Sequence, residues 1–349
     1  MNSESNPPRQ LALRDGTLIG DGRPPYLIAE VNTSHFGKLS VGIEMVERVA
    51  NAGFDCVKFQ SWNPESLYSS SFLAGNSVQR RMLSQFAFSP EELEHLSVHA
   101  NHCGIAFSST PYSLEQASWL VHGCNAPFVK IASMDITYLK QIRGIAALGA
   151  PVILSTGMAD MPEIRDACGV LGDEDIQFAI LHCVSLYPTP IDAANVRNIA
   201  GLREVFPKSV VGFSDHTIGS AAAVASIALG ASIIEKHVTL DPTVIGMDNQ
   251  MALDLDRAAQ FADTCREAAQ SLGSTDRRVS AAEHKQRRVM RRSLVATVDI
   301  PIGAKISPTD IAAYRPGDGL PADQIDYFIG RIATRNIGSG EKLLRDDAR

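Results

Sequence analysis

Short apolar runs alternate with amphipathic stretches along most of the chain. The apolar runs predict strands that are covered on both faces, and the stretches with apolar residues at helical spacing predict helices. Ser89 is expected to cap one of these helices. The predicted strands span residues 26–31, 54–60, 105–109, 128–132, 151–155, 176–184, 210–213 and 232–237. The predicted helices span residues 41–52, 90–103, 114–122, 138–148, 161–171, 193–206, 220–229 and 255–272.

Eight such strand–helix units over about 250 residues are typical of an α/β fold, the (β/α)8 TIM barrel. An open, doubly wound sheet is the alternative. Eight units make it the weaker alternative, and the chain lacks the Gly-rich dinucleotide fingerprint.

The segments on either side of the barrel have a different composition. Residues 1–25 contain two Asp-Gly turn signals and predict an N-terminal β-hairpin extension before a barrel at residues 26–272. Residues 273–292 are polar and basic, and we interpret them as a solvated, partly helical linker. Residues 293–349 are punctuated by Pro and Gly and predict a small β-rich domain with short helical turns.

Composition narrows the class of protein. The chain of 349 residues is 45% hydrophobic and has a net charge of −7, which argues against a general nucleic-acid binder. Its six cysteines are scattered without CxxC spacing and predict reduced thiols in a cytoplasmic protein. We expect no signal peptide and no membrane span, because no apolar run approaches the required length.

Polar residues end nearly every predicted strand, at the edge where parallel α/β folds bind ligands. His216 and His237 end neighbouring strands, which suggests a metal site. The alternative is two unrelated histidines. Lys58 and Lys130 lie inside apolar strands, where an unpaired ammonium is costly. Together with Ser133, Ser155 and Ser214 they predict a pocket for a phosphate and a carboxylate.

Two other interpretations of the lysines remain open. Each could form an internal salt bridge to Glu30 or Glu235. A buried lysine at a barrel mouth could also form a Schiff base with a carbonyl substrate, as in aldolases and lyases of 2-keto sugar acids. The paired histidines weigh against that second function, since a metal and a Schiff base are usually alternative ways to activate a carbonyl.

Seven motifs, in order, resemble the sialic acid (N-acetylneuraminate) synthase family over about residues 11–345. The tail, with Arg291-Arg-Ser293 and Arg315-Pro-Gly317, resembles its C-terminal antifreeze-like (SAF) domain. The barrel motifs are Ile28-Ala-Glu30, Val57-Lys58-Phe59-Gln60, Lys130-Ile-Ala-Ser133, Ser155-Thr-Gly-Met158, His182-Cys-Val-Ser-Leu-Tyr187-Pro188, Gly212-Phe-Ser-Asp-His216-Thr and Glu235-Lys-His237.

The resemblance implies a transferase that condenses phosphoenolpyruvate with an N-acetylmannosamine-type sugar, giving a nine-carbon 2-keto acid and phosphate. It implies a divalent metal, Mn²⁺ or Mg²⁺, on His216 and His237. It also implies a homodimer in which each SAF domain closes the partner's barrel and Arg315 reaches an N-acyl carbonyl. The remaining residues implied to bind phosphoenolpyruvate or the sugar are Lys58, Lys130, Ser133, Ser155, Ser214, Gln60, Asn76, Ser185 and Tyr187.

Three carboxylates, Glu30, Asp135 and Asp248, are candidates to position water and move protons. Several positions near the sugar depart from the family's pattern. Asp135 stands where Glu is common, Ser185 where Asn is common, and Asn249 where a histidine follows the aspartate. The acceptor therefore stays open among N-acetylmannosamine, a phosphorylated form, and a 2,4-diacetamido-6-deoxyhexose that leads to legionaminic acid.

Overall fold

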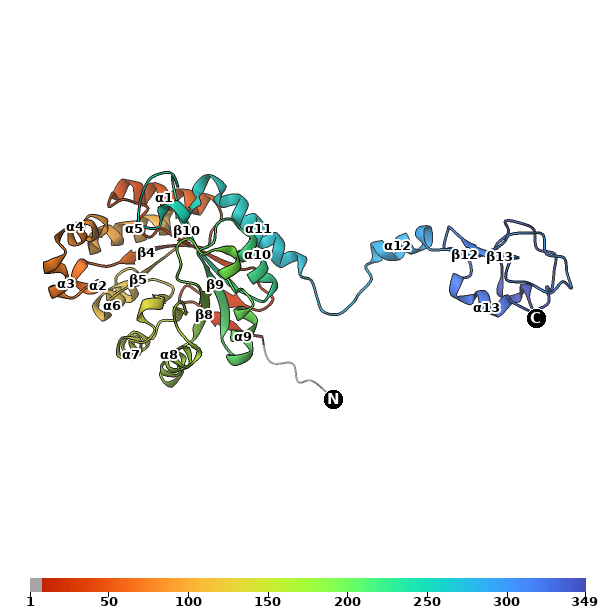
Figure 1. Ribbon diagram of the computed structural model, residues 1–349, viewed down its shortest axis with the longest axis horizontal. Helices are drawn as coiled ribbons and strands as arrows, with labels where there is room; N and C mark the ends of the chain where they lie inside the picture. Colours follow the sequence, from red (N-terminus) through yellow and green to blue (C-terminus); the bar gives the residue numbers. More distant parts are fainter. Residues whose placement is uncertain (1–7) are drawn as a thin grey trace. The chain divides into compact units, whose positions relative to one another are not determined.

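The computed structural model describes residues 8–349 (Figure 1). It contains two compact units, one that ends at Gly273 and one that begins at Ser274. No helix in the described part of the chain is long and apolar enough to cross a membrane. All six cysteines are free thiols.

Parallel strands form the centre of the first unit, in the order β5-β4-β3-β10-β9-β8-β7-β6. The two ends of this order, β5 and β6, lie against each other, and Ser108 Oγ donates to the Phe128 carbonyl at 3.1 Å. The sheet thus curls into a barrel, which confirms the predicted fold class. The strands are β3 (Tyr26–Glu30), β4 (Cys56–Ser61), β5 (Ala106–Pro111), β6 (Val129–Ile131), β7 (Val152–Ser155), β8 (Phe178–Cys183), β9 (Val210–Asp215) and β10 (Ile233–Thr239).

Helices cover the outside of this barrel (Figure 1). Their ends are set by local chemistry: Ser89 and Glu92 form a reciprocal capping box at the start of α5, and Asp160 and Glu163 do the same for α8. The outer helices are α1 (Leu39–Asn51), α5 (Pro90–His102), α6 (Leu114–His122), α7 (Leu139–Ala146), α8 (Met161–Asp173), α9 (Asn198–Val205), α10 (Ala221–Ala228) and α11 (Ala258–Ser271).

The structure corrects two details of the predicted elements. Helices α2 (Pro64–Leu67), α3 (Ser70–Gly75) and α4 (Ser77–Phe86) lie between β4 and α5, where none was predicted. The helix expected at residues 193–206 begins only at Asn198, because Asn195 has a left-handed φ of 46° that interrupts the helical path. A short strand, β11 (Leu253–Asp254), extends β10 by parallel pairing.

The predicted N-terminal hairpin is present as antiparallel β1 (Gln10–Ala12) and β2 (Leu18–Gly20). Leu11, Leu13 and Ile19 join a buried apolar cluster with the barrel residues Tyr26 and Phe128. Since Tyr26 begins β3, the hairpin closes the amino end of the barrel. The carboxyl end of the strands is therefore the end that is open to ligands.

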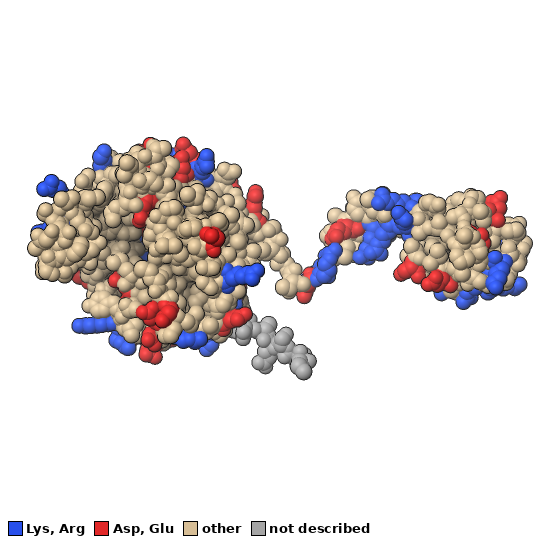
Figure 2. All heavy atoms as spheres, in the orientation of Figure 1, with Lys and Arg blue, Asp and Glu red and all other residues tan. Residues whose placement is uncertain are grey.

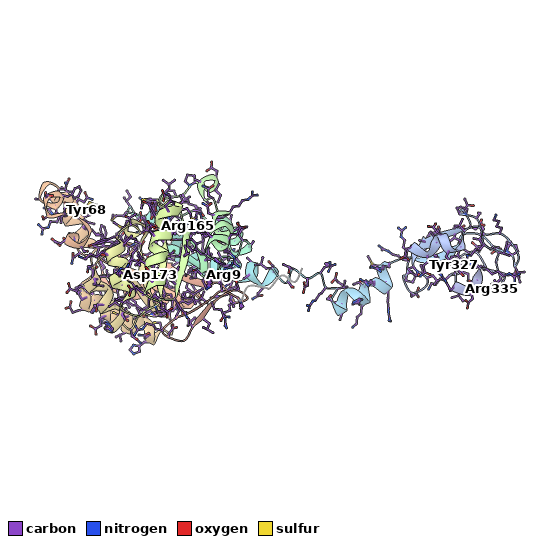
Figure 3. All side chains as sticks on the ribbon, turned by 90° about the horizontal axis from the view of Figure 1, so that it is seen from below. Arg9, Tyr68, Arg165, Asp173, Tyr327 and Arg335 are labelled. Atoms are coloured by element: carbon purple, nitrogen blue, oxygen red, sulfur yellow. The ribbon has the colours of Figure 1, made fainter. Side chains whose placement is uncertain are left out.

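The second unit has its own core, which includes Leu294, Ile306, Phe328 and Leu343. Its elements are α12 (Ala281–Met290), the antiparallel pair β12 (Ser293–Ala296) and β13 (Ile311–Tyr314), and α13 (Ile325–Phe328). Tyr327 (labelled in Figure 3) lies 4.0 Å from the Arg331 guanidinium and 3.5 Å from that of Arg345, measured from the ring centroid.

Basic side chains gather along α12, as the space-filling view shows (Figure 2). No residue of this helix is buried within the chain. The lysines and arginines of α12 and of the residues on either side of it are Arg277, Arg278, Lys285, Arg287, Arg288, Arg291 and Arg292.

Gly212 in β9 tests the packing of the barrel interior. A Cβ at this position would lie 2.6 Å from both the Ile233 carbonyl oxygen and Leu181 Cδ2. We expect Gly212→Ala to lower the free energy of unfolding by about 1–3 kcal/mol, because backbone must shift to admit the methyl group. Gly201→Ala, on α9 with no atom within 4 Å of its Cβ position, is the control and should stabilise by about 0.5–1 kcal/mol. Equal denaturation midpoints for Gly212→Ala and wild type would contradict this packing.

Candidate active site

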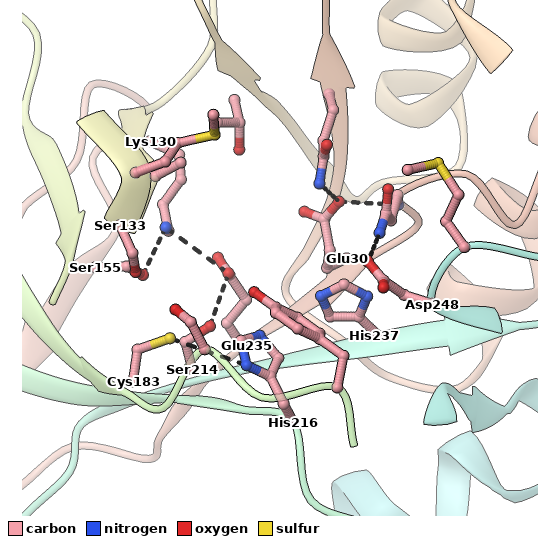
Figure 4. Close-up of a pocket in the computed structure, with 18 of the residues that line it drawn as sticks. Glu30, Lys130, Ser133, Ser155, Cys183, Ser214, His216, Glu235, His237 and Asp248 are labelled. Atoms are coloured by element: carbon pink, nitrogen blue, oxygen red, sulfur yellow. Dashed lines mark hydrogen bonds and ion pairs between the residues drawn. The ribbon is translucent and has the colours of Figure 1, made fainter. Parts of the chain in front are cut away.

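A cavity of about 360 Å³ opens at the carboxyl ends of the strands (Figure 4). Side chains from both halves of the barrel converge on it, as the strand-end pattern predicts. The predicted site residues that line it are Glu30, Lys58, Gln60, Lys130, Ser133, Ser155, Ser185, Tyr187, Ser214, His216, His237 and Asp248.

The two lysines lie at the base of the cavity and are only 2% and 3% exposed. Lys58 Nζ donates to Glu30 and, at 3.0 Å, to Thr110 Oγ1. Lys130 Nζ donates to Ser155 Oγ at 2.7 Å and to the Ile131 carbonyl at 3.2 Å. Each ammonium has three N–H groups, so each keeps one beyond these two bonds.

Glu235 joins the two lysines. Its carboxylate lies 3.6 Å from Lys58 Nζ and 3.8 Å from Lys130 Nζ, and Ser214 Oγ donates to it at 3.1 Å. Its Oε2 has no hydrogen-bond partner among the described residues. The lysines thus form the internal salt bridges that were one of the predicted alternatives. The same network also has N–H groups that could donate to a bound anion.

Burial and the nearby glutamates shift the pKa values of the two lysines in opposite directions. Burial alone would lower the pKa of Lys58, but Glu235 and Glu30 raise it overall. Burial lowers the pKa of Lys130, and the attraction of Glu235 only partly opposes the effect. Lys58 is therefore the more firmly cationic of the two.

His216 and His237 lie side by side, with ring centroids 5.2 Å apart and planes nearly perpendicular. His216 Nδ1 is 2.9 Å from the Val184 carbonyl, so this nitrogen carries the proton and Nε2 keeps its lone pair. Burial holds the pKa of His237 well below 6.5, and protonation of His216 would lower it further. Two imidazoles with available nitrogens suit a divalent metal ion.

No group of three or more His, Cys, Asp and Glu side chains within residues 8–349 is arranged to hold a metal. A metal on these two histidines would thus take its other ligands from water or substrate, as catalytic sites with open positions do. The residues present fit such an ion.

Alternation along the strands separates the histidines from their sequence neighbours. Asp215 and Lys236 point to the outer side of the barrel, where they form an ion pair of 2.8 Å. Lys236 Nζ lies 5.8 Å from the ring centroid of Phe261 on α11. His182 also does not line the cavity, and its Nε2 lies 2.8 Å from the Ala194 carbonyl.

The three candidate carboxylates have different surroundings. Glu30 is fully buried and is tied to Lys58, whereas Asp248 accepts a hydrogen bond from Asn32 Nδ2. Asp135 follows Ser133 beside the cavity, and its Oδ2 is buried without a hydrogen-bond partner among the described residues. Burial raises the pKa of Asp135 to about 6, although Lys130 opposes the shift.

Three predicted site residues are not among those that line this cavity: Asp135, which lies beside it, Asn76 and Arg315. Asn76 lies between α3 and α4, where its Nδ2 donates to the Phe72 carbonyl at 2.8 Å. The amide is used to hold the end of α3, and Asn76 is not among the cavity residues. Arg315 belongs to the second unit, where its Nε donates to the Met290 carbonyl at 3.0 Å.

Part of the cavity wall was missed because α2 and α4 were not predicted. Leu67, Tyr68 and Leu83 come from this insertion, and Trp62 immediately precedes it. The Asn63-Pro64 pair carries a signal for α2, since Asn63 caps the helix and Pro64 occupies its first turn.

Comparison with known proteins gives the family. The model of the NeuB family matches residues 45–277. The chain belongs to the NeuB family. The model of the SAF domain matches residues 291–349, which include β12, β13 and α13.

Similarity to known relatives extends over nearly the whole of this NeuB-family chain. It is 34% identical to an N,N'-diacetyllegionaminic acid synthase of Campylobacter jejuni, over 92% of this chain and 98% of the relative. It is 30% identical to the human N-acetylneuraminate-9-phosphate synthase, over 97% of each. The solved structure of an N-acetylneuraminic acid synthetase from Leptospira borgpetersenii matches with a TM-score of 0.74 and 28% identity, over 80% of this chain and 95% of that one. The family resemblance drawn from the motifs is confirmed.

Proposed function

We propose that this NeuB-family chain is a transferase that condenses phosphoenolpyruvate with an N-acylated, mannosamine-type sugar. The products are a nine-carbon 2-keto acid, such as N-acetylneuraminate or a legionaminate, and phosphate. The buried network of Lys58, Glu235 and Lys130 beside two histidines carries this proposal. Synthases of such acids are also the named relatives.

Phosphoenolpyruvate is proposed to bind at the base of the cavity. The free N–H groups of Lys58 and Lys130, with the hydroxyls of Ser133, Ser155 and Ser214, supply donors for a phosphate and a carboxylate. Ser133 Oγ already accepts from the Gly157 N–H at 2.9 Å, so its own proton is free to be donated.

The reaction joins C3 of phosphoenolpyruvate to the aldehyde carbon of the open-chain sugar, and the aldehyde oxygen takes a proton to become a hydroxyl. Water adds to C2, and phosphate leaves from the resulting tetrahedral carbon to give the ketone. A divalent ion on His216 and His237, Mn²⁺ or Mg²⁺, would act as a Lewis acid toward the aldehyde. Glu30, Asp135 and Asp248 are the groups proposed to position water and move these protons.

The rest of the acceptor is proposed to lie toward Gln60, Ser185 and Tyr187, whose ring centroid is 4.3 Å from that of His216. We propose a homodimer in which the partner subunit's Arg315 binds the N-acyl oxygen of the sugar, since its guanidinium offers two donors in one plane. We place the enzyme in the cytoplasm, in keeping with its free thiols.

Asp135 should give the enzyme an acidic limb in its pH profile. Its carboxylate form accumulates above a pKa of about 6, so kcat/KM should fall roughly tenfold per pH unit below that value if this ion is required. Asp135→Asn should lower kcat by about 10²–10⁴-fold and should lose this limb. An Asp135→Asn enzyme with the wild-type pH profile would show that Asp135 is not the group that titrates.

One observation favours a second function. The lowered pKa of Lys130 would help it to form a Schiff base with a 2-keto acid, as a lyase requires. Incubation with pyruvate and borohydride distinguishes the two functions. The synthase should show no added mass, whereas a covalent adduct at Lys130 would overturn the proposed condensation mechanism.

A further inference from the structure

We infer that Asn32 is a further positioning residue for the reaction, which holds the Asp248 carboxylate at the cavity through a side-chain hydrogen bond. The inference rests on the proposed function, in which Asp248 positions water or moves a proton. It is carried by the hydrogen bonds, the burial and the backbone conformation of Asn32, and by the exposure of the loop that carries Asp248.

Asn32 joins two of the candidate carboxylates. Its backbone N–H donates to Glu30 Oε1 at 2.8 Å, and its side-chain Nδ2 donates to Asp248. Its φ of 46° lies in the left-handed region, which asparagine adopts more readily than most residues do. Asn32 is only 6% exposed, so water competes little for either bond. One buried residue thus sets the position of Asp248 relative to Glu30.

Glu30 is the fixed end of this connection. Its Oε1 also accepts from Gln60 Nε2 at 3.1 Å, and its Oε2 accepts from Lys58. The Gln60 amide is itself held, because the Tyr112 hydroxyl donates to Gln60 Oε1 at 3.0 Å. Both carboxylate oxygens of Glu30 are therefore bound within the barrel, and Asn32 is attached to a network that has little freedom to move.

Asp248 is the end that needs to be held. It lies in the loop of residues 240–248 that follows β10, and Val244 and Ile245 of this loop are 42% and 85% exposed. Within the described residues, the Asn32 amide is the only hydrogen-bond donor to the Asp248 carboxylate. Without that bond, we expect the carboxylate to sample several positions.

The loop of residues 32–37 is suited to this role, because its first four residues are buried. The His35 ring stacks on Phe88 with ring centroids 3.9 Å apart. Phe36 has a φ of 51°, a strained conformation for a bulky residue that persists only where the surroundings hold it. Its ring lies against the loop after β10, since a Cβ on Gly246 would be 3.3 Å from Phe36 Cε1. The loop after β10 thus rests on a firmly held support.

Asn32→Gly tests the side chain alone, because glycine adopts a left-handed φ freely and keeps the N–H that donates to Glu30. We expect kcat to fall about 10-fold to 100-fold, since a displacement of about 1 Å at a reacting group has an effect of this size. The KM for phosphoenolpyruvate should change less than about threefold, because its proposed donors are not touched. Wild-type kcat in Asn32→Gly would overturn the inference.

Two further variants show whether the loss passes through Asp248. Asn195→Gly is the matched control, because Asn195 has the same φ of 46°, donates to the Ala193 carbonyl at 3.0 Å and does not line the cavity. Its kcat should equal that of wild type. Asp248→Ala should lower kcat about 10²-fold or more. In that background Asn32→Gly should cost less than about threefold further, since the group that it positions is already gone. Independent losses that multiply would overturn the inference.

Hydrogen exchange gives a readout that does not depend on turnover. The amides of residues 241–248 should exchange at least about fivefold faster in Asn32→Gly than in wild type or Asn195→Gly, because the loop loses its bond to the barrel. If the wild type forms 2-keto acid but this exchange is unchanged in Asn32→Gly, the inference fails and the proposed function stands. If the wild type releases no phosphate with any acylamino hexose, the proposed function fails, and the catalytic part of the inference fails with it.

Discussion

Replacing His216 or His237 by alanine is expected to lower kcat about a thousandfold or more, which corresponds to about 4 kcal/mol of transition-state stabilisation. Each ring is buried at the cavity, and together they are the groups that fit a divalent ion. His182→Ala is the matched control. It also removes a buried strand-end histidine, but that ring bonds to the Ala194 carbonyl outside the cavity. Its kcat should stay within about threefold of wild type, although its stability should fall.

Metal binding itself provides a readout that is independent of turnover. Titration of the free Mn²⁺ signal by electron paramagnetic resonance should show one bound ion in wild type and His182→Ala, and weak or no binding in His216→Ala and His237→Ala. The neighbouring thiol of Cys183 and the Val184 carbonyl outweigh burial and raise the pKa of His216, so affinity should increase with pH as this proton is lost. Full activity in excess chelator would rule out the metal role.

Arg315→Ala is expected to raise the KM for the sugar about tenfold to a hundredfold, with little change for phosphoenolpyruvate. A bidentate guanidinium contact is worth about 1.5–3 kcal/mol, and the phosphate and carboxylate have their own donors at the base of the cavity. The kinetic split between the two substrates is the measurement. A matching rise in both KM values would indicate a general structural role for Arg315.

Mixed dimers decide whether Arg315 acts on its own barrel or on that of its partner. One chain carries Arg315→Ala and the other carries His216→Ala. If the partner subunit's Arg315 completes each site, one site contains both lesions and the other contains none, so about half of wild-type activity should return. If Arg315 acts within its own chain, each site contains one lesion and almost no activity should return. An inactive mixed dimer made of stable chains would therefore exclude the exchanged arrangement.

The fold could be predicted because the barrel consists of repeated strand–helix units, each with a recognisable local pattern of apolar residues. Each strand is a short apolar run, and the Ser89-Pro90 pair predicts the first turn of α5. Helices α2 and α3 were not predicted because they are short, and α4 was not predicted because it has few buried residues. Their position depends on contacts with the barrel mouth, such as the bond from Trp62 Nε1 to the Leu83 carbonyl.

The site residues that could be predicted are those whose burial without a partner would be costly. Buried lysines and paired strand-end histidines draw attention in a sequence for that reason. The sequence could name Glu235 as a partner for a lysine, but not that it lies between both of them, since this depends on which strands are neighbours in the closed barrel. The unpartnered oxygen of Asp135 is likewise visible only when the surrounding groups are in place.

The identity of the three-carbon donor tests the central claim most directly. With an acylamino hexose and Mn²⁺, the protein should release one phosphate for each 2-keto acid formed from phosphoenolpyruvate, and should form no product from pyruvate. Without the sugar, no phosphate should be released. Formation of the same acid from pyruvate, or phosphate release that does not depend on the sugar, would contradict the assignment of this site to phosphoenolpyruvate condensation.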